Sequence, residues 1–273
     1  MTLQPLEGKR IACIGAGNMA FSLLSGLHRA GIAGIELRVT DVVSSQLGKF
    51  AALSARTGTD NRAATDDADI IVLAVKPQVL PAILAALPLA PHQLLISIAA
   101  GIPLRTLAAG SAVNQPIVRC MPNTPALVGA GITALFANAH VTGVMREQAE
   151  AFLRSVGRAV WVQSEADLDA VTAVSGSGPA YFFYLMEAMV RAGVELGLPP
   201  DLALELTRET AYGAALLARN SEHDPATLRA NVTSPGGTTE RAISLMNEAR
   251  CADGIVRALH GAAQRSAELA KDS

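Results

Sequence analysis

The chain lacks the marks of several large classes of protein. Its 273 residues carry a net charge of −2 and only three cysteines, which are widely spaced. The near-neutral balance offers no basic surface for nucleic acid, and an odd cysteine count supplies neither a disulfide framework nor a metal motif. We therefore expect reduced thiols (Cys13 and Cys120 in strand-like apolar runs), no metal and no nucleic-acid partner.

A long apolar run is also missing. The most apolar stretch, residues 81–102, is broken by Pro88, Pro91 and Gly101, whereas a membrane-spanning helix needs about 20 consecutive apolar residues. The first ten residues contain Pro5 and Glu7 and lack the apolar centre of a signal peptide. We expect a cytoplasmic protein that does not enter a membrane.

Up to about residue 163, short β-rich runs alternate with helical segments. The predicted strands are Arg10–Ile14, Ile35–Thr40, Ile70–Val75, Leu94–Ile98, Ile117–Met121, Ile132–Phe136 and Ala159–Val162. The predicted helices between them are Phe21–Ala30, Ser44–Arg56, Gln78–Ala86, Pro103–Ala109 and Thr142–Val156. This alternation predicts an α/β Rossmann-like domain over residues 1–163, with a doubly wound and mostly parallel sheet.

Residues 164–273 show helical spacing only, which predicts an all-α domain. The predicted helices are Ala166–Val174, Pro179–Leu196, Asp201–Ala218, Pro225–Asn231, Thr238–Ala249 and Gly254–Leu269. The run Tyr181–Met186 is apolar around the whole helix and must be buried on all sides. A second subunit would bury it, which favours a homodimer; a central helix wrapped by its own neighbours is the alternative.

The first predicted strand runs directly into a glycine-rich turn, Gly15-Ala16-Gly17-Asn18-Met19-Ala20, that opens a helix. Gly15 permits a tight turn, Gly17 allows the backbone to approach phosphates, and the free N–H groups of the helix N-terminus attract anions. With a strand before it and a helix after it, the turn predicts a site for the pyrophosphate of a dinucleotide.

Thr40 ends the second predicted strand and Asp41 follows it, where a Rossmann fold places its adenosine ribose. A carboxylate at this point accepts a hydrogen bond from a ribose 2′-OH and repels a 2′-phosphate, which favours NADH or use of both cofactors. An aspartate that only caps the Ser44 region is an equal alternative.

Three more motifs end predicted strands, where ligands of parallel sheets bind. Ala74-Val75-Lys76-Pro77 brings a lysine toward the cofactor phosphates or ribose, or simply into solvent. The small residues Ala99 and Ala100 suit a flat nicotinamide ring. Asn123, in a turn with two prolines, is a donor for the carboxamide or ribose, or holds the turn itself.

Two loops rich in small residues stand out in the helical half. Residues 175–181 are predicted to form a flexible loop that leads into a helix, and residues 231–239 combine hydroxyls, glycine N–H groups and a helix N-terminus. The second combination is typical of a receptor for a carboxylate or phosphate. An ordinary Ser/Thr cap with a glycine turn is the alternative.

In their order and spacing, these motifs resemble those of pyrroline-5-carboxylate reductases over essentially the whole chain. The motifs that carry the resemblance are Gly15–Met19, Ala74–Gln78, Ser97–Gly101, Met121–Pro125, Ser175–Tyr181 and Val232–Thr239. The resemblance implies reduction of 1-pyrroline-5-carboxylate to L-proline with NADPH or NADH, the last step of proline biosynthesis. It also implies a helical domain that interlocks with its twin, with dimers assembled into a larger ring such as a decamer.

The resemblance also assigns residues to roles. Thr239 is implied to bond the ring nitrogen of the substrate, and Glu222 matches a candidate acid, although the adjoining His223 and Asp224 depart from the family pattern and leave the acid open. The implied substrate residues are Ser177, Gly178, Ser234, Gly236, Gly237, Thr238 and Thr239. The expected cofactor residues are Gly15, Gly17, Asn18, Met19, Thr40, Asp41, Ala74, Val75, Lys76, Pro77, Ala99, Ala100 and Asn123.

Two other functions are compatible with parts of the pattern. A β-hydroxyacid or imine reductase of the type with a catalytic lysine also has a Rossmann half and a helical half. Between Phe50 and Ala270, however, the only lysine is Lys76, which argues against a lysine acid in the helical half. A protein that binds NAD(P)H without turnover is the second alternative, and the two loops of the helical half argue against it.

Overall fold

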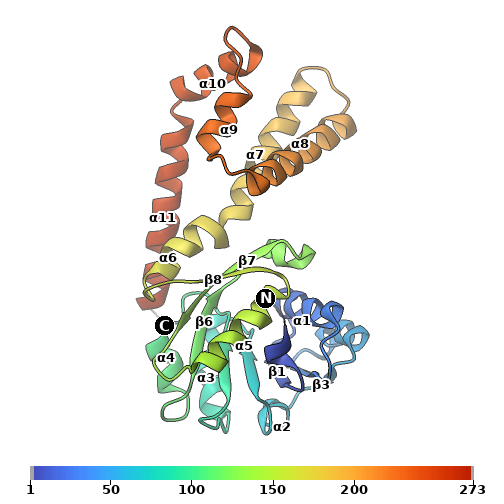
Figure 1. Cartoon of the computed structure of the whole chain (residues 1–273), viewed down its shortest axis with the longest axis vertical. Helices are drawn as coiled ribbons and strands as arrows, with labels where there is room; N and C mark the ends of the chain where they lie inside the picture. Colours follow the sequence, from blue (N-terminus) through green and yellow to red (C-terminus); the bar gives the residue numbers. More distant parts are fainter. Residues whose placement is uncertain (1–2, 272–273) are drawn as a thin grey trace. The chain divides into compact units, whose positions relative to one another are not determined.

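The computed structural model describes residues 3–271, so the outer ends of the two predicted domains, residues 1–2 and 272–273, lie outside it (Figure 1). The chain divides into two compact units. The first holds the chain up to Ser177 together with the chain from Ala262 onward, and the second holds residues 178–261.

The first unit is built on an eight-stranded sheet in the order β3-β2-β1-β4-β5-β6-β7-β8. Neighbouring strands are parallel except β6 and β7, which are antiparallel. The strands are β1 (Arg10–Ile14), β2 (Glu36–Thr40), β3 (Arg56–Gly58), β4 (Ile70–Leu73), β5 (Leu94–Ser97), β6 (Ile117–Met121), β7 (Gly131–Ala137) and β8 (Gly157–Trp161). The predicted doubly wound, mostly parallel sheet is confirmed, and every predicted strand is present.

Helices cover both faces of this sheet. The α-helices of the first unit are α1 (Asn18–Ala30), α2 (Asn61–Thr65), α3 (Leu80–Ala86), α4 (Leu104–Ala109), α5 (Gly143–Arg154) and α6 (Asp167–Val171). Short 3₁₀ turns are η1 (Gln4–Leu6), η2 (Ser44–Gln46), η3 (Gly48–Leu53), η4 (Pro77–Val79) and η5 (Thr124–Val128), and η6 (Thr172–Gly176) is a π-turn.

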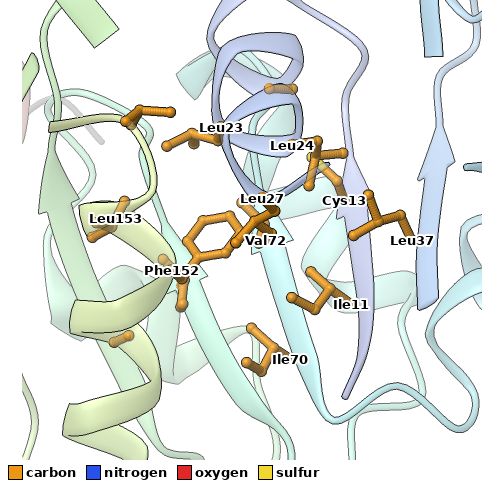
Figure 2. Packing of buried hydrophobic residues seen from close by; sticks show 14 of the residues in the cluster. Ile11, Cys13, Leu23, Leu24, Leu27, Leu37, Ile70, Val72, Phe152 and Leu153 are labelled. Carbon is orange, nitrogen blue, oxygen red and sulfur yellow. The ribbon is translucent and has the colours of Figure 1, made fainter. Parts of the chain in front are cut away.

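Alternate residues of each central strand point into two separate cores. Figure 2 shows Leu27 of α1 beside the Phe152 ring of α5, and Leu24 of α1 near Cys13 of β1. The second core lies on the opposite face and gathers α2, α3 and α4 over residues such as Ile71 of β4. Because side chains alternate along a strand, a strand buried on both faces is apolar throughout, as the burial of every β4 residue shows.

The predicted helix over Ser44–Arg56 is wrong. The chain instead forms η2 and η3 and then β3, a strand that pairs in parallel with β2. Gly48 is a poor helix former, and Ser54 adopts a left-handed φ of 55° that ends the helical path before Arg56. The sequence reading also missed α2, which begins where the Asp60 carboxylate accepts hydrogen bonds from the next N–H groups.

The second unit is helical, as predicted. It contains α7 (Gly178–Glu195), α8 (Pro200–Asn220), α9 (Pro225–Asn231), α10 (Thr238–Glu248) and the first part of α11 (Cys251–Lys271). Side chains of the apolar run on α7 are widely exposed: Phe182 is 64%, Phe183 56% and Tyr184 76% accessible. A helix wrapped by its own neighbours is therefore excluded. Of the described helices, none combines the length and apolar character that a bilayer crossing needs.

The far end of α11 packs within the first unit. The Ser266 hydroxyl donates to Asp169 Oδ1 at 2.7 Å, and Arg105 Nη2 donates to the Ala270 carbonyl at 2.8 Å. Gly101, with a φ of 73°, lies so close to Leu269 that a Cβ there would stand 3.1 Å from the leucine Cβ. The chain therefore returns to the unit from which it started.

A charge network joins the amino-terminal ends of the central strands. Arg10 of β1 pairs with Asp67 at 2.8 Å and with Asp69 at 3.3 Å. Arg38 of β2 also donates to Asp67 and pairs with Glu36 at 3.4 Å. The hydrogen bond from Arg38 is the main cause that lowers the pKa of Asp67 to about 2.

We expect Asp67→Asn to flatten the acid limb of the stability curve. A carboxylate whose pKa is lower in the folded state stabilises the fold above its unfolded pKa of 3.8 and loses that contribution as the pH falls toward about 2. Urea unfolding from pH 5 to pH 2 measures this. Asp66→Asn, which removes an exposed neighbouring carboxylate, is the control, and an unchanged acid limb in Asp67→Asn would contradict the assignment.

Candidate active site

The predicted cofactor residues lie along one edge of the sheet. They follow the carboxyl ends of β2, β1, β4, β5 and β6, which are consecutive neighbours in the strand order. The chain reverses its winding direction at β1, because β2 lies on one side of it and β4 on the other. A parallel sheet opens a ligand crevice at such a reversal, outside the carboxyl ends of the two strands.

Gly15 stands at this reversal point and has no room for a side chain. Its φ is +103°, and a Cβ would lie 2.5 Å from the Ala74 carbonyl oxygen that follows β4. Its N–H donates to the Thr40 carbonyl at 2.8 Å, which ties the turn to the end of β2. Glycine at this position lets the ends of three strands meet.

The first turn of α1 is open to an anion. Gly17 is the N-cap and contributes no side-chain bond, so the N–H groups of Asn18 and Met19 have no partner in the described part of the chain. No described atom lies within 4 Å of a Cβ built on Gly17, which leaves the backbone accessible. These features fit a pyrophosphate, whose charge the helix N-terminus would balance.

Asp41 holds the glycine-rich turn. Its Oδ2 accepts the Ala16 N–H at 2.8 Å, and its Oδ1 accepts the Val43 N–H at 2.8 Å. The second bond agrees with the alternative in which this aspartate caps the start of the next segment. The first bond, however, places a carboxylate directly against the proposed phosphate turn.

A cavity of about 650 Å³ opens beside Asp41. It is lined by apolar side chains such as Val79 and Ile83 and by the polar Thr40 and Asn61. The Thr40 hydroxyl donates to Asn61 Oδ1 at 2.6 Å. The volume falls within the range of small-molecule sites.

The sequence reading missed Asn61 and its neighbour Arg62, which also lines the cavity. The one available signal was the helix-start pattern Asp60-Asn61 after a short strand.

The other predicted cofactor residues differ in their surroundings. Lys76 is exposed at the start of η4, and Ala99 is buried whereas Ala100 is exposed. Asn123 is 8% accessible: its Oδ1 accepts the Ile132 N–H at 3.0 Å, and its Nδ2 donates to the Ser175 carbonyl at 3.1 Å. Both ends of this amide are therefore engaged by the protein.

The predicted flexible loop at residues 175–181 is not a loop. It forms the end of the π-turn η6 and, from Gly178, the start of α7. The Ser177 N–H closes the π-turn by donating to the Thr172 carbonyl at 2.8 Å. The small residues predict a break in the helix, but the segment stays helical because a π-turn accommodates it.

In the second unit, the predicted anion loop leads into α10. Gly236 has a φ of +70°, the Gly237 N–H donates to the Ser234 carbonyl at 3.0 Å, and Gly237 caps the helix without a side-chain bond. The N–H groups of Thr238 and Thr239 have no partner among the described residues. Thr239 is half-buried in this first turn.

Glu240 is a site residue that the sequence reading missed. Its Oε2 accepts the Gly236 N–H at 2.8 Å, so an internal carboxylate already occupies one donor of the anion loop. The available signal was the spacing of a capping box, in which an acidic residue on the third helical position reaches back toward the cap.

The two acids near α9 have different surroundings. Glu222 is exposed. Asp224 caps α9, and the hydrogen bond from the Thr227 N–H lowers the pKa of its carboxyl group. A carboxyl group that is held in its charged form is a poor proton donor.

The three thiols are free, with Cys13 and Cys120 buried and Cys251 exposed. Burial raises the pKa of Cys13 to about 12, so this thiol does not act as a nucleophile. Within residues 3–271, no group of three or more His, Cys, Asp or Glu side chains is placed to hold a metal ion.

Comparison with known proteins settles the family. Residues 165–269 match the model for pyrroline-5-carboxylate reductase dimerisation, and residues 10–101 match one for coenzyme F420-dependent NADP oxidoreductases. A pyrroline-5-carboxylate reductase of Pseudomonas aeruginosa is 51% identical over 96% of this chain and 97% of its own length. The chain belongs to the pyrroline-5-carboxylate reductase family. The resemblance read from the motifs is thus confirmed.

Solved structures agree with this assignment. A pyrroline-5-carboxylate reductase from Coxiella burnetii superposes with a TM-score of 0.89 at 38% identity, covering 96% of this chain and 99% of its own. One from Plasmodium falciparum, with NADP bound, has a TM-score of 0.86 at 28% identity, covering 97% and 99%. The helical half of this reductase is a dimerisation domain, which explains the exposed apolar side chains of α7.

We expect Gly15→Ala to lower both stability and cofactor affinity in this reductase. The left-handed φ and the overlap with the Ala74 carbonyl should cost about 2 kcal/mol or more in the free energy of unfolding. Gly17→Ala is the matched variant, because its Cβ meets no described atom. It should unfold like the wild type in urea while its Kd for NAD(P)H rises about tenfold. Equal unfolding of the two variants would contradict this account.

We expect Glu240→Gln to lower the KM for pyrroline-5-carboxylate by about two- to fivefold, because it removes a negative charge beside a receptor for a carboxylate yet keeps an oxygen that can accept the Gly236 N–H. Steady-state kinetics at saturating NAD(P)H measures the change. Glu248→Gln, at the other end of α10, is the control. A KM that rises instead would mean that the charge of Glu240 serves the substrate.

Proposed function

We propose that the chain reduces 1-pyrroline-5-carboxylate to L-proline with NAD(P)H, using the glycine-rich turn for the cofactor and the loop before α10 for the substrate. The observation that carries this proposal is the open first turn of α10, which presents free N–H groups and the Thr239 hydroxyl in a chain of this family. Residues 1–163 are assigned to cofactor binding and residues 164–273 to substrate binding and dimerisation.

The cofactor, when bound, supplies the hydride that reduces the C=N bond. The residues proposed to hold it are those at the carboxyl edge of the sheet: Gly15, Gly17, Asn18, Met19, Thr40, Asp41, Ala74, Val75, Lys76, Pro77, Ala99 and Ala100. Asn123 was expected among them, but both ends of its amide are bonded to the protein, and it is given a different role below. The open space at Gly17, where a Cβ would meet no described atom within 4 Å, and the unpaired N–H groups of α1 support this assignment.

The chain's own residues bind and orient the imine. Ser234, Gly236, Gly237 and Thr238 would hold the substrate carboxylate, with Ser177 and Gly178 as further contacts. The Thr239 hydroxyl would bond the ring nitrogen, which must carry a proton before the neighbouring carbon becomes a good hydride acceptor. Glu222 is the proposed acid. Most of the acceleration would come from holding the reacting atoms in place.

The match to the dimerisation family supports a homodimer. Assembly of such dimers into a larger ring, such as a decamer, is proposed from the resemblance alone. A cytoplasmic location is proposed as well, because the reduction consumes NAD(P)H and the cysteines are free.

Oxidation of NADH and of NADPH, followed at 340 nm with pyrroline-5-carboxylate, tests the function, and the ratio of the two kcat/KM values tests whether Asp41 disfavours a 2′-phosphate. Thr239→Val should lower kcat by about tenfold or more and change the KM for NAD(P)H by less than about twofold, because the lost hydroxyl serves the substrate alone. Thr227→Val, which alters an exposed threonine of α9, is the control. Cofactor binding without turnover in the wild type would overturn the proposal.

A further inference from the structure

The helix around Ser175 contains a backbone acceptor that has lost its normal partner. In an α-helix the carbonyl of residue 175 would accept from the N–H of residue 179, but residue 179 is proline and has no N–H. The same segment winds as the π-turn η6, closed by the bond from the Ser177 N–H to the Thr172 carbonyl. Ser175 is half-buried, and a carbonyl that is shielded from water and unpaired is costly, so a partner from elsewhere in the fold stabilises it.

The end of β6 supplies that partner. Asn123 Nδ2 donates to the Ser175 carbonyl at 3.1 Å, across 52 residues of sequence. The asparagine cannot turn away easily, because its Oδ1 accepts the Ile132 N–H and its side chain is almost fully buried. One amide therefore joins the sheet to the π-turn.

A second contact lies beside the first. The Met121 methyl group packs against Gly176 so closely that a Cβ on residue 176 would make the flexible end of the methionine shift. The carboxyl end of β6 thus touches the π-turn at two neighbouring points, Met121 with Gly176 and Asn123 with Ser175. The turn leads directly into Ser177, one of the proposed substrate residues.

We propose that Asn123 is a positioning residue for the reduction, which holds the π-turn and through it Ser177 by replacing the N–H that Pro179 lacks. This inference rests on the proposed function for its link to the substrate. It differs from the cofactor role in one respect that can be measured. An N–H restored at position 179 would substitute for Asn123 as a partner of Ser175, whereas it could not substitute for a contact with the cofactor.

The test is a double-mutant cycle of Asn123→Ala with Pro179→Ala. Asn123→Ala should lower kcat/KM for pyrroline-5-carboxylate by about tenfold, because it strands the Ser175 carbonyl, while the KM for NADH stays within about twofold. In the Pro179→Ala background the loss should shrink to about threefold or less, since the backbone N–H restored by that substitution can donate to the Ser175 carbonyl.

Asn138→Ala is the matched control. Asn138 also accepts a strand N–H, from Ile117 at 3.2 Å, and donates to a backbone carbonyl, that of Gln115 at 2.8 Å. Its removal should lower the Tm with the same effect in both backgrounds and leave the KM for pyrroline-5-carboxylate unchanged. This control separates a general loss of hydrogen bonds from the specific link to the π-turn.

Three further results of this mutant cycle would support or overturn the proposed role of Asn123. An equal loss from Asn123→Ala in both backgrounds would overturn it, and so would a KM for NADH that rises as much as the KM for the substrate. If Asn123→Ala does not fold, recovery of soluble protein and of Tm in the double variant supports the link, and failure to recover refutes it. Absence of turnover in the wild type would overturn the proposed function instead, while the Tm cycle would still test the bond.

Discussion

At the carboxyl edge of the sheet, where the proposed cofactor residues lie, the arrangement depends on the absence of a side chain at Gly15. The Ala74 carbonyl passes so close that any Cβ would overlap it, and the turn's own N–H is bonded to the end of β2. Three strands can therefore finish at nearly the same point, and the helix that follows begins with its N–H groups open. A larger residue would have to push the strand ends apart, and with them the Asp41 carboxylate that steadies the turn.

The two ends of the central strands differ in how their polar groups are paired. At the amino-terminal ends, Arg10 and Arg38 both pair with the Asp67 carboxylate. At the carboxyl ends, backbone N–H groups are left unpaired and the charges lie at the rim of a cavity. The second unit also combines paired and unpaired backbone donors. In the loop before α10, the Glu240 carboxylate accepts the Gly236 N–H, whereas the N–H groups of the first turn of α10 have no partner among the described residues.

Features that depend on local sequence were predictable, and those that depend on distant partners were not. The strands and the glycine-rich turn follow from apolar runs and from conformations that only glycine adopts easily. The prediction of a helix around Gly48 is wrong because Ser54 adopts a left-handed backbone conformation, after which the chain pairs with the edge of the sheet as β3. Small residues near Ser175 suggested a loop, because nothing local shows that Asn123 would satisfy the carbonyl that Pro179 leaves unpaired.

The return of α11 to the first unit has a topological consequence. The second unit is an insertion whose two ends are both joined to the same body, at residues 177–178 and again at 261–262. The bonds of Ser266 and Arg105 anchor the second connection. A domain joined through two chain segments carries one more covalent constraint than a domain that hangs on a single linker. A break in one of its surface loops would likewise leave both halves of the chain held together.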